Sequence, residues 1–138
     1  MPISMEELTR RVHAATPFIG HLGVEIVAAG DGAATLLLPL RPELTQDLGH
    51  AHGGVVGSLA DIACNLALRA PSVTIEYKLN FLRGAAGDRL RAEAVLLRDG
   101  RSTAVAESRI WAEKEGEEPV LVAVCLATLA PQRRPAAD

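Results

Sequence analysis

Aromatic residues are scarce in this sequence: tryptophan, tyrosine and phenylalanine together make up 3% of the 138 residues. Proteins that bind single-stranded nucleic acid stack the bases on aromatic side chains, so this composition argues against that class. The sequence also lacks a basic excess, because 14 Lys and Arg residues stand against 17 Asp and Glu residues. A formal net charge of −3 provides no electrostatic footprint for general nucleic-acid binding or for a membrane surface.

Cysteine is nearly absent as well. The two cysteines, Cys64 and Cys125, lie in apolar stretches and form no CxxC pair. This usage is typical of buried thiols in a reducing compartment, and it argues against a zinc site or a redox motif. The apolar run at 120–131 is too short for a membrane helix, and the N-terminus has no apolar signal-peptide core. We therefore expect a cytoplasmic protein.

The remaining composition is that of a folded domain. Hydrophobic residues make up 49% and charged residues 22% of the chain, which is ordinary for a globular protein. A length of 138 residues corresponds to one domain. We expect this domain to span residues 1–130 and the last residues, 131–138, to form a flexible tail.

Hydrophobic periodicity predicts an amphipathic helix at 4–15, ended by Pro17, and a buried helix at 53–69 that is apolar almost all round. Two strands are predicted within 22–40 around a tight turn, and four more at 72–82, 88–98, 102–114 and 118–130. Short turns join the last three strands, which predicts an antiparallel meander. The whole order predicts an α+β domain, in which a curved antiparallel sheet of about six strands wraps around the central helix.

The segment 72–82 has the clearest alternation in the sequence. Its apolar members should share one face of the strand: Val73, Ile75, Tyr77, Leu79 and Phe81. Its polar members should share the other: Ser72, Thr74, Glu76, Lys78 and Asn80. The apolar faces of this strand and of the central helix are too extensive for one small sheet to cover. We therefore expect at least a dimer, with this strand at or near the subunit boundary.

Asp61 is the sharpest chemical feature, because a carboxylate in the middle of an apolar helix must be paired, protonated or exposed at a cleft. It shares a helical face with Gly57, Ser58 and Asn65, small or polar residues beside which a ligand or another backbone could approach closely. Two interpretations stay open at this point. Asp61 is either a catalytic carboxylate or a structural one that binds a neighbouring loop or an interface.

The run from His50 to Gly54 opens the same helix. Its two glycines, Gly53 and Gly54, leave unhindered N–H groups at the positive end of the helix dipole, which suits an oxyanion or a polarised carbonyl. The alternative is that the glycines only make a tight entry turn. His50 and His52 could suggest a metal site with Asp47, but no further ligand completes it, and we expect none.

Arginine is concentrated between residues 83 and 109, where six basic side chains stand against four acidic ones. This local excess could bind a phosphate-bearing ligand. The alternative, for each of these arginines, is a solvated face of the sheet.

The stretch from Gln46 to Asp61, QDLGHAHGGVVGSLAD, resembles the signature of the hotdog-fold acyl-CoA thioesterases. That signature combines an amide residue, HGG and a spaced acidic residue within a long helix. The nearest branches are the PaaI-like type of the phenylacetic-acid pathway and the related 4-hydroxybenzoyl-CoA thioesterases. The downstream segment TIEYKLNFLRGAAGDRLRAEAVLLRDGRSTAVAESRIW resembles the strand pattern of the same family. The resemblance covers roughly residues 18–130.

The resemblance implies four catalytic roles. Asp61 matches the family's catalytic carboxylate, which acts as a general base on water or as a nucleophile. Gly53 matches the glycine whose N–H polarises the thioester carbonyl. Gln46 stands where the family usually has Asn, an amide that binds the thioester or the water. Thr74 matches a Ser or Thr contributed by the partner subunit.

The resemblance also implies how the substrate binds. His52 matches the motif histidine, which supports the loop, and we expect His52 and Gly54 to take part in binding the substrate. The CoA phosphates would lie on surface arginines, for which the best candidates are Arg83, Arg98 and Arg101. The expected protein is a homodimer or homotetramer that needs neither a metal nor another cofactor.

The predicted function is hydrolysis of a small acyl-CoA, aryl acyl groups included, to a free acid and CoA. A hotdog hydratase or dehydratase would need the patterns DxxxxH or HxxxGxxPG, which are absent. A non-catalytic acyl-CoA-binding protein is the main alternative, and the intact HGG with Asp61 argues against it.

Overall fold

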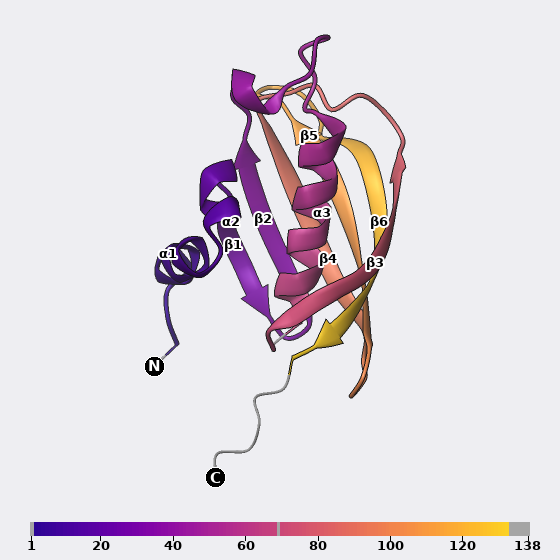
Figure 1. Ribbon diagram of the computed structural model, residues 1–138. Coiled ribbons are helices and arrows are strands. Elements are labelled where there is room, and N and C mark those ends of the chain that lie inside the picture. The colour runs from indigo at the N-terminus through magenta and orange to yellow at the C-terminus, as the bar shows by residue number, and fades with distance from the viewer. Residues whose placement is uncertain (1, 69, 133–138) are drawn as a thin grey trace.

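The computed structural model describes residues 2–68 and 70–132 (Figure 1). The helices of this part of the chain are α1 (Met5–Ala15), α2 (Pro17–Leu22), a 3-10 helix (Pro42–Leu44) and α3 (Gly53–Ala67). The strands are β1 (Glu25–Gly30), β2 (Ala33–Pro39), β3 (Ser72–Phe81), β4 (Arg89–Asp99), β5 (Ala104–Glu113) and β6 (Val120–Pro131).

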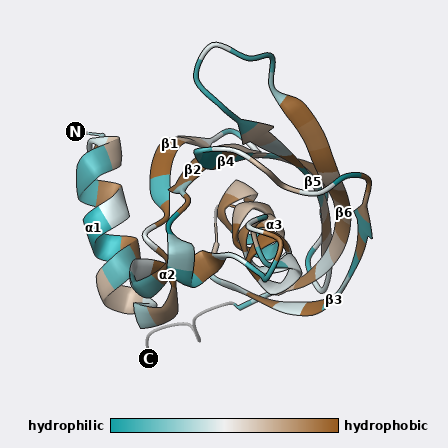
Figure 2. Cartoon of the chain, turned by 90° about the horizontal axis from the view of Figure 1, so that it is seen from above, coloured by the Kyte–Doolittle hydropathy of each residue, from teal (hydrophilic) through white to brown (hydrophobic). Residues whose placement is uncertain are grey.

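The strands of the described residues form one antiparallel sheet in the order β1-β2-β4-β5-β6-β3. The predicted meander is confirmed in β4, β5 and β6, which are consecutive neighbours. After α3 the chain returns as β3 to the far edge, beside β6. Seen from above, the sheet curves around α3 while α1 and α2 lie to one side, next to β1 (Figure 2). The predicted architecture, a curved sheet wrapped around a central helix, is confirmed.

The core lies between α3 and the concave face of the sheet. The largest fully buried aliphatic side chains come from the helix and four strands: Leu36, Leu38, Leu59, Leu90, Ile110 and Leu129. Burial of each such side chain stabilises the fold by about 1.5–3 kcal/mol. Ser108 is the buried polar residue on this face, and its hydroxyl donates to the Ala60 carbonyl at 3.0 Å. Both cysteines are buried, as expected, and both are free thiols.

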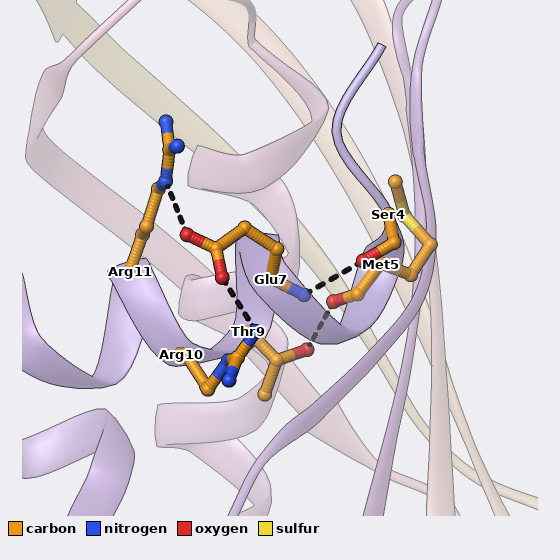
Figure 3. A network of polar contacts seen from close by, with 6 residues as sticks. All are labelled: Ser4, Met5, Glu7, Thr9, Arg10 and Arg11. Atoms are coloured by element: carbon orange, nitrogen blue, oxygen red, sulfur yellow. Dashed lines mark hydrogen bonds and ion pairs between the residues drawn. The ribbon is translucent and has the colours of Figure 1, made fainter.

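Helix α1 begins after the N-cap residue Ser4. The Ser4 hydroxyl accepts from the Glu7 N–H at 3.1 Å, and the Glu7 carboxylate pairs with Arg10 at 2.6 Å and Arg11 at 2.9 Å (Figure 3). The two arginines hold the pKa of Glu7 below its usual value, mainly through the hydrogen bond from Arg11. A capped and paired first turn explains why so short a helix forms at this end of the chain.

Pro17 ends α1, as predicted, but it also begins a second helix that the sequence pattern did not reveal. Proline is well suited to the first position of a helix, because it has no N–H to leave unpaired. Helix α2 then ends at Gly23, whose φ of +84° is the left-handed conformation of a helix C-terminus. Six residues are too few for a helical period to be recognised.

A β-bulge at Ile75 changes the predicted faces of β3. Thr74 pairs with Leu129 and Glu76 pairs with Thr128, so Ile75 is the extra residue. An extra residue reverses the inward and outward positions that follow it. Tyr77, Leu79 and Phe81 therefore point at α3, whereas the side chains of Val73 and Ile75 remain 56% exposed. The single apolar face predicted for this strand is wrong.

Strand β6 continues into the region expected to be a flexible tail. Pro131 pairs with Ser72, and the Gln132 N–H donates to the Pro71 carbonyl at 2.8 Å. The rest of that segment, 133–138, lies outside the described residues. Across residues 2–68 and 70–132, no helix combines the length and hydropathy needed to cross a membrane.

Candidate active site

One row of α3 side chains faces β3 along the whole helix. The row is Gly53, Gly57, Asp61 and Asn65, spaced four residues apart. Along the N-terminal half of α3, strand β3 packs very closely. A Cβ on Gly53 would lie 3.2 Å from Phe81 Cζ, and one on Gly57 would lie 3.3 Å from Leu79 Cδ2. The two glycines therefore allow β3 to pack closely against α3. The other half of the row, Asp61 and Asn65, is polar.

Asp61 is half-buried and is held by β3. Its Oδ1 accepts from the Thr74 hydroxyl at 2.6 Å and from Asn65 Nδ2 at 3.2 Å. The same Asn65 amide donates to Thr74 Oγ1 at 2.8 Å, and its Oδ1 accepts from the Ser72 hydroxyl at 2.6 Å. Both hydrogen bonds to the carboxylate fall on Oδ1, so Oδ2 has no donor among the described residues. The network orients one oxygen and leaves the other available for chemistry.

This network differs from the expected arrangement of Thr74. The resemblance implied that the partner subunit supplies the hydroxyl, but Thr74 of the same chain already contacts Asp61. The bulge at Ile75 explains this geometry, since residues before it have their polar members directed at α3. Asn65 and Ser72 had no predicted role. The available signal for Asn65 was its spacing of four residues from Asp61, which places both side chains on one helical row.

Asp61 and Thr74 line a cavity of about 670 Å³. Polar groups from α3 and β3 lie on one side: Ser58, Asp61, Asn65, Ser72 and Thr74. Apolar side chains contributed by α1, α2 and α3 include Val12, Ala15, Phe18, Ile19, Ile62 and Leu66. A carboxylate at the wall of a largely apolar cavity is a typical arrangement for a small-molecule site.

Gln46 and Gly53 line a different pocket, of about 390 Å³, at the N-terminus of α3. The Gly53 N–H has no acceptor among the described residues, whereas the Gly54 N–H donates to His52 Nδ1 at 2.9 Å. His52 is thus the N-cap of α3. Gly54 is not free to bind substrate through its N–H, so the open donor at this helix end belongs to Gly53.

The Gln46 side chain is tied to its own loop. Its Oε1 accepts a hydrogen bond from the Leu48 N–H. The backbone closes the same loop, because the Gln46 N–H donates to the His50 carbonyl at 2.8 Å and its carbonyl accepts from Gly49 at 2.9 Å. With its oxygen engaged, the amide can offer Nε2 as a donor to a ligand in the pocket beside Gly53.

The two halves of the predicted site are therefore apart within one chain. Asp61 with Thr74 forms one half, and Gln46 with Gly53 forms the other, in separate pockets. Gly53 and Asp61 are eight residues apart on one helix, which corresponds to about 12 Å along its axis. One reacting carbon cannot touch both within a single chain.

The three predicted phosphate-binding arginines are not gathered together. Arg83 lines the pocket of Gln46 and Gly53. Arg98 lies at the end of β4, in the row that runs through Val105 and Thr128 to Glu76 in the middle of β3. Arg101 follows in the β4–β5 turn. All three are exposed, and Arg83 is the one beside a predicted catalytic group.

The Cys64 thiol is an unsuitable alternative nucleophile at this site. A hydrogen bond with Cys125 and burial hold the pKa of the Cys64 thiol far above its usual value. A thiol that stays protonated is a poor nucleophile. Within the described residues no group of three His, Cys, Asp or Glu side chains is placed to hold a metal ion. The Asp61 carboxylate is thus the strongest candidate for the chemistry.

Comparison with known proteins finds a matching family and similar proteins of known name. The family described as Thioesterase superfamily matches residues 48–119. The acyl-coenzyme A thioesterase PaaI of Escherichia coli is 35% identical over 97 residues, which cover 64% of this chain and 66% of that protein. The 1,4-dihydroxy-2-naphthoyl-CoA hydrolase of Listeria monocytogenes is 31% identical over 101 residues, which cover 68% of this chain and 81% of that protein.

The fold has an equally clear counterpart among solved structures. A thioesterase family protein from Silicibacter pomeroyi superposes with a TM-score of 0.83 at 32% sequence identity. The superposition covers 92% of this chain and 97% of that one.

Proposed function

Because this chain belongs to the thioesterase superfamily and is a thioester hydrolase of the PaaI-like hotdog type, we propose that it hydrolyses acyl-CoA to a free acid and CoA, with Asp61 as the reacting carboxylate. The observation that carries this proposal is the position of Asp61. Its Oδ1 is held by Thr74 and Asn65, while the side chain lines a cavity large enough for a ligand.

Asp61 can activate water or attack the thioester itself. As a general base, it takes a proton from water while the water oxygen bonds to the thioester carbon. As a nucleophile, it forms a mixed anhydride that water then cleaves. In both routes the C–S bond breaks and the CoA thiolate takes up a proton. The free Oδ2 would be the reacting oxygen in each case, because Oδ1 is already held.

Gly53 would stabilise the negative charge that develops on the thioester oxygen. Its N–H is an unpaired donor at the positive end of the α3 dipole. A preorganised donor of this kind typically contributes ~10²–10³-fold to kcat. Gln46 Nε2 would provide a second donor in the same pocket.

The separation between Gly53 and Asp61 supports a site shared by two chains. In such a dimer, Asp61 of one chain would lie opposite Gly53 and Gln46 of its partner. The surface of β3 supports this assembly, because β3 is an edge strand and both Val73 and Ile75 are 56% exposed on it. An apolar edge strand is a ready site for pairing with a second copy.

Arg83 would then bind a phosphate of CoA. It is exposed and borders the Gln46 and Gly53 pocket, where the thioester oxygen is proposed to bind. A flexible arginine at the mouth of a pocket suits a phosphate outside it. Arg98 and Arg101 remain secondary candidates on the far side of the chain.

The experiment that tests the proposal is release of free thiol from a panel of acetyl-, benzoyl-, phenylacetyl- and decanoyl-CoA. We expect the wild-type protein to release thiol and Asp61→Asn to lower kcat by about 10²–10⁴-fold. Asp99→Asn, which removes an exposed carboxylate at the end of β4, is the matched control and should retain full activity.

Two outcomes would contradict the proposal. Acyl-CoA binding without thiol release from any substrate would indicate a non-catalytic acyl-CoA-binding protein. An Asp61→Asn variant that kept more than about a tenth of wild-type kcat would make Asp61 structural, since a general base contributes at least ~10²-fold.

A further inference from the structure

The cavity beside Asp61 is walled by two helices that lie outside the sheet. Val12 and Ala15 come from α1, and Phe18 and Ile19 come from α2. Across the cavity, α3 contributes Ile62 and Leu66, and the polar groups around Asp61 occupy another part of the wall. We infer that the α1–α2 segment is the wall of an acyl-binding chamber, and that Ala15 and Phe18 set a preference for bulky apolar acyl groups. The inference rests on the proposed function, because it places the thioester at Asp61.

The rows of α3 explain why the chamber has a polar and an apolar part. Asp61 and Asn65 lie on the row that faces β3, and both form hydrogen bonds with Thr74. The adjacent row, which includes Ile62 and Leu66, faces the cavity. A thioester carbonyl near Asp61 would thus have its acyl group directed along apolar side chains, which favour an apolar group over a polar one.

Helices α1 and α2 are held firmly enough to form a defined wall. The Thr9 hydroxyl accepts from the Ile26 N–H at 3.1 Å, and His13 Nε2 lies 2.6 Å from the Val24 carbonyl oxygen. At the end of α2, the Arg41 guanidinium donates to the carbonyls of Leu22 and His21, each at 2.7 Å. Bonds to β1 and to the segment after β2 therefore fix both helices on the scaffold.

Phe18 has an exposure that its packing does not explain. Its side chain is 53% exposed although it is a large apolar residue on a short helix. It lines the cavity together with Ala15, which is itself exposed at the end of α1. A bulky acyl group in the cavity would cover both side chains. The cavity volume, about 670 Å³, falls in the range of sites that hold drug-sized ligands and far exceeds what an acetyl group fills.

The test compares acetyl-CoA with phenylacetyl- and decanoyl-CoA in variants of the wall. Ala15→Phe fills the chamber, and because Ala15 is exposed, the larger side chain displaces no core residue. We expect Ala15→Phe to lower kcat/KM for the two bulky substrates by at least ~10-fold while acetyl-CoA changes less than about 2-fold. Phe18→Ala removes apolar contact and should raise KM for the bulky substrates only.

The matched control is Leu97→Ala, which removes a side chain of similar exposure, 55%, from β4 outside the cavity. It should leave kcat/KM unchanged for all three substrates. Circular dichroism and thermal unfolding of each variant show whether the fold is retained. Binding of decanoyl-CoA, measured by calorimetry, supplies a readout that does not depend on turnover.

The outcomes separate this inference from the proposed function. If Ala15→Phe lowers activity equally for acetyl- and decanoyl-CoA, or lowers neither, the acyl group lies elsewhere and the inference is overturned while thioester hydrolysis stands. If the wild-type protein hydrolyses no acyl-CoA, the proposed function fails. In that case loss of decanoyl-CoA binding in Ala15→Phe alone would still support the chamber, and unchanged binding would overturn it.

Discussion

The Thr74 hydroxyl donates a hydrogen bond of 2.6 Å to the Asp61 carboxylate of its own chain. The bond joins the edge strand β3 to the central helix α3 one residue before the bulge at Ile75. It fixes Oδ1 of a carboxylate that lines the large cavity. We therefore infer that Thr74 positions Asp61 within one subunit.

Replacement of Thr74 should affect kcat rather than KM. Thr74→Val keeps the shape of the side chain but removes its donor, so Asp61 loses its shortest hydrogen bond. We expect kcat to fall about 10-fold with KM nearly unchanged, since the interaction orients the reacting group and not the substrate. Thr74→Ser restores the hydroxyl and should recover most of kcat. Equal changes in KM for both variants would indicate a substrate contact instead.

Mixed dimers can decide whether two chains share the site. We expect Gln46→Ala to impair turnover, because it removes a donor from the pocket of Gly53. In a dimer of one Asp61→Asn chain and one Gln46→Ala chain, a shared site leaves one active site with both lesions and the other with neither. About half of the wild-type activity per dimer should return, measured on dimers purified with two different tags.

The pairing of Asp61→Asn with Thr74→Val chains is the control for that experiment. Asp61 and Thr74 belong to the same half of the site, so each active site of this mixed dimer keeps one lesion and its activity should not exceed the mean of the two parent dimers. Recovery in both mixed dimers would place Thr74 in the other half. Recovery in neither would place all of these residues in a site within one chain.

The outward face of β3 should govern association. Ile75 is the bulged residue of the edge strand and is 56% exposed. A charge there would have to be buried in a dimer that pairs along β3, so we expect Ile75→Glu to be monomeric in light scattering and to lose activity. Leu97→Glu, at a position 55% exposed on β4, should remain a dimer. A dimeric Ile75→Glu protein would exclude β3 from the interface.

The outer face of the sheet carries an ion pair whose contribution should depend on pH. Arg91 Nε lies 2.8 Å from Glu113 Oε1, and this hydrogen bond holds the pKa of Glu113 below its usual value. A lowered carboxylate pKa stabilises the fold above the unfolded value of about 4.3 and loses that effect as the pH falls through the folded value. Glu113→Gln should therefore cost up to about 1 kcal/mol of unfolding free energy at pH 7 and nothing in strong acid.

Urea unfolding at pH 7 and at pH 3 measures that difference. The control is Glu93→Gln, because Glu93 is more exposed and lies 4.0 Å from Arg91. It should change stability by less than Glu113→Gln does at pH 7. A Glu113→Gln effect that is as large in acid as at neutral pH would mean that packing, not charge, is lost.

Local periodicity was sufficient to predict most of the fold. The apolar pattern at 53–69 and the alternation of the later strands are properties of neighbouring residues, so they can be recognised without the partners they pack against. The glycines and the acid of α3 could be identified for the same reason, because their spacing along one helix determines their row. The helix at 17–22 escaped detection because it has too few residues to show a period.

The tertiary structure decided how the site is assembled. The bulge at Ile75 depends on the register with β6, which no alternation within 72–82 reveals, and it determines that Thr74 rather than Val73 faces α3. The cavity depends on how α1 and α2 are tied to β1 and Arg41, through contacts distant in sequence. Sequence indicated which residues are candidates for the chemistry, and long-range packing decided which of them meet, because distances between segments are set only when the chain is folded.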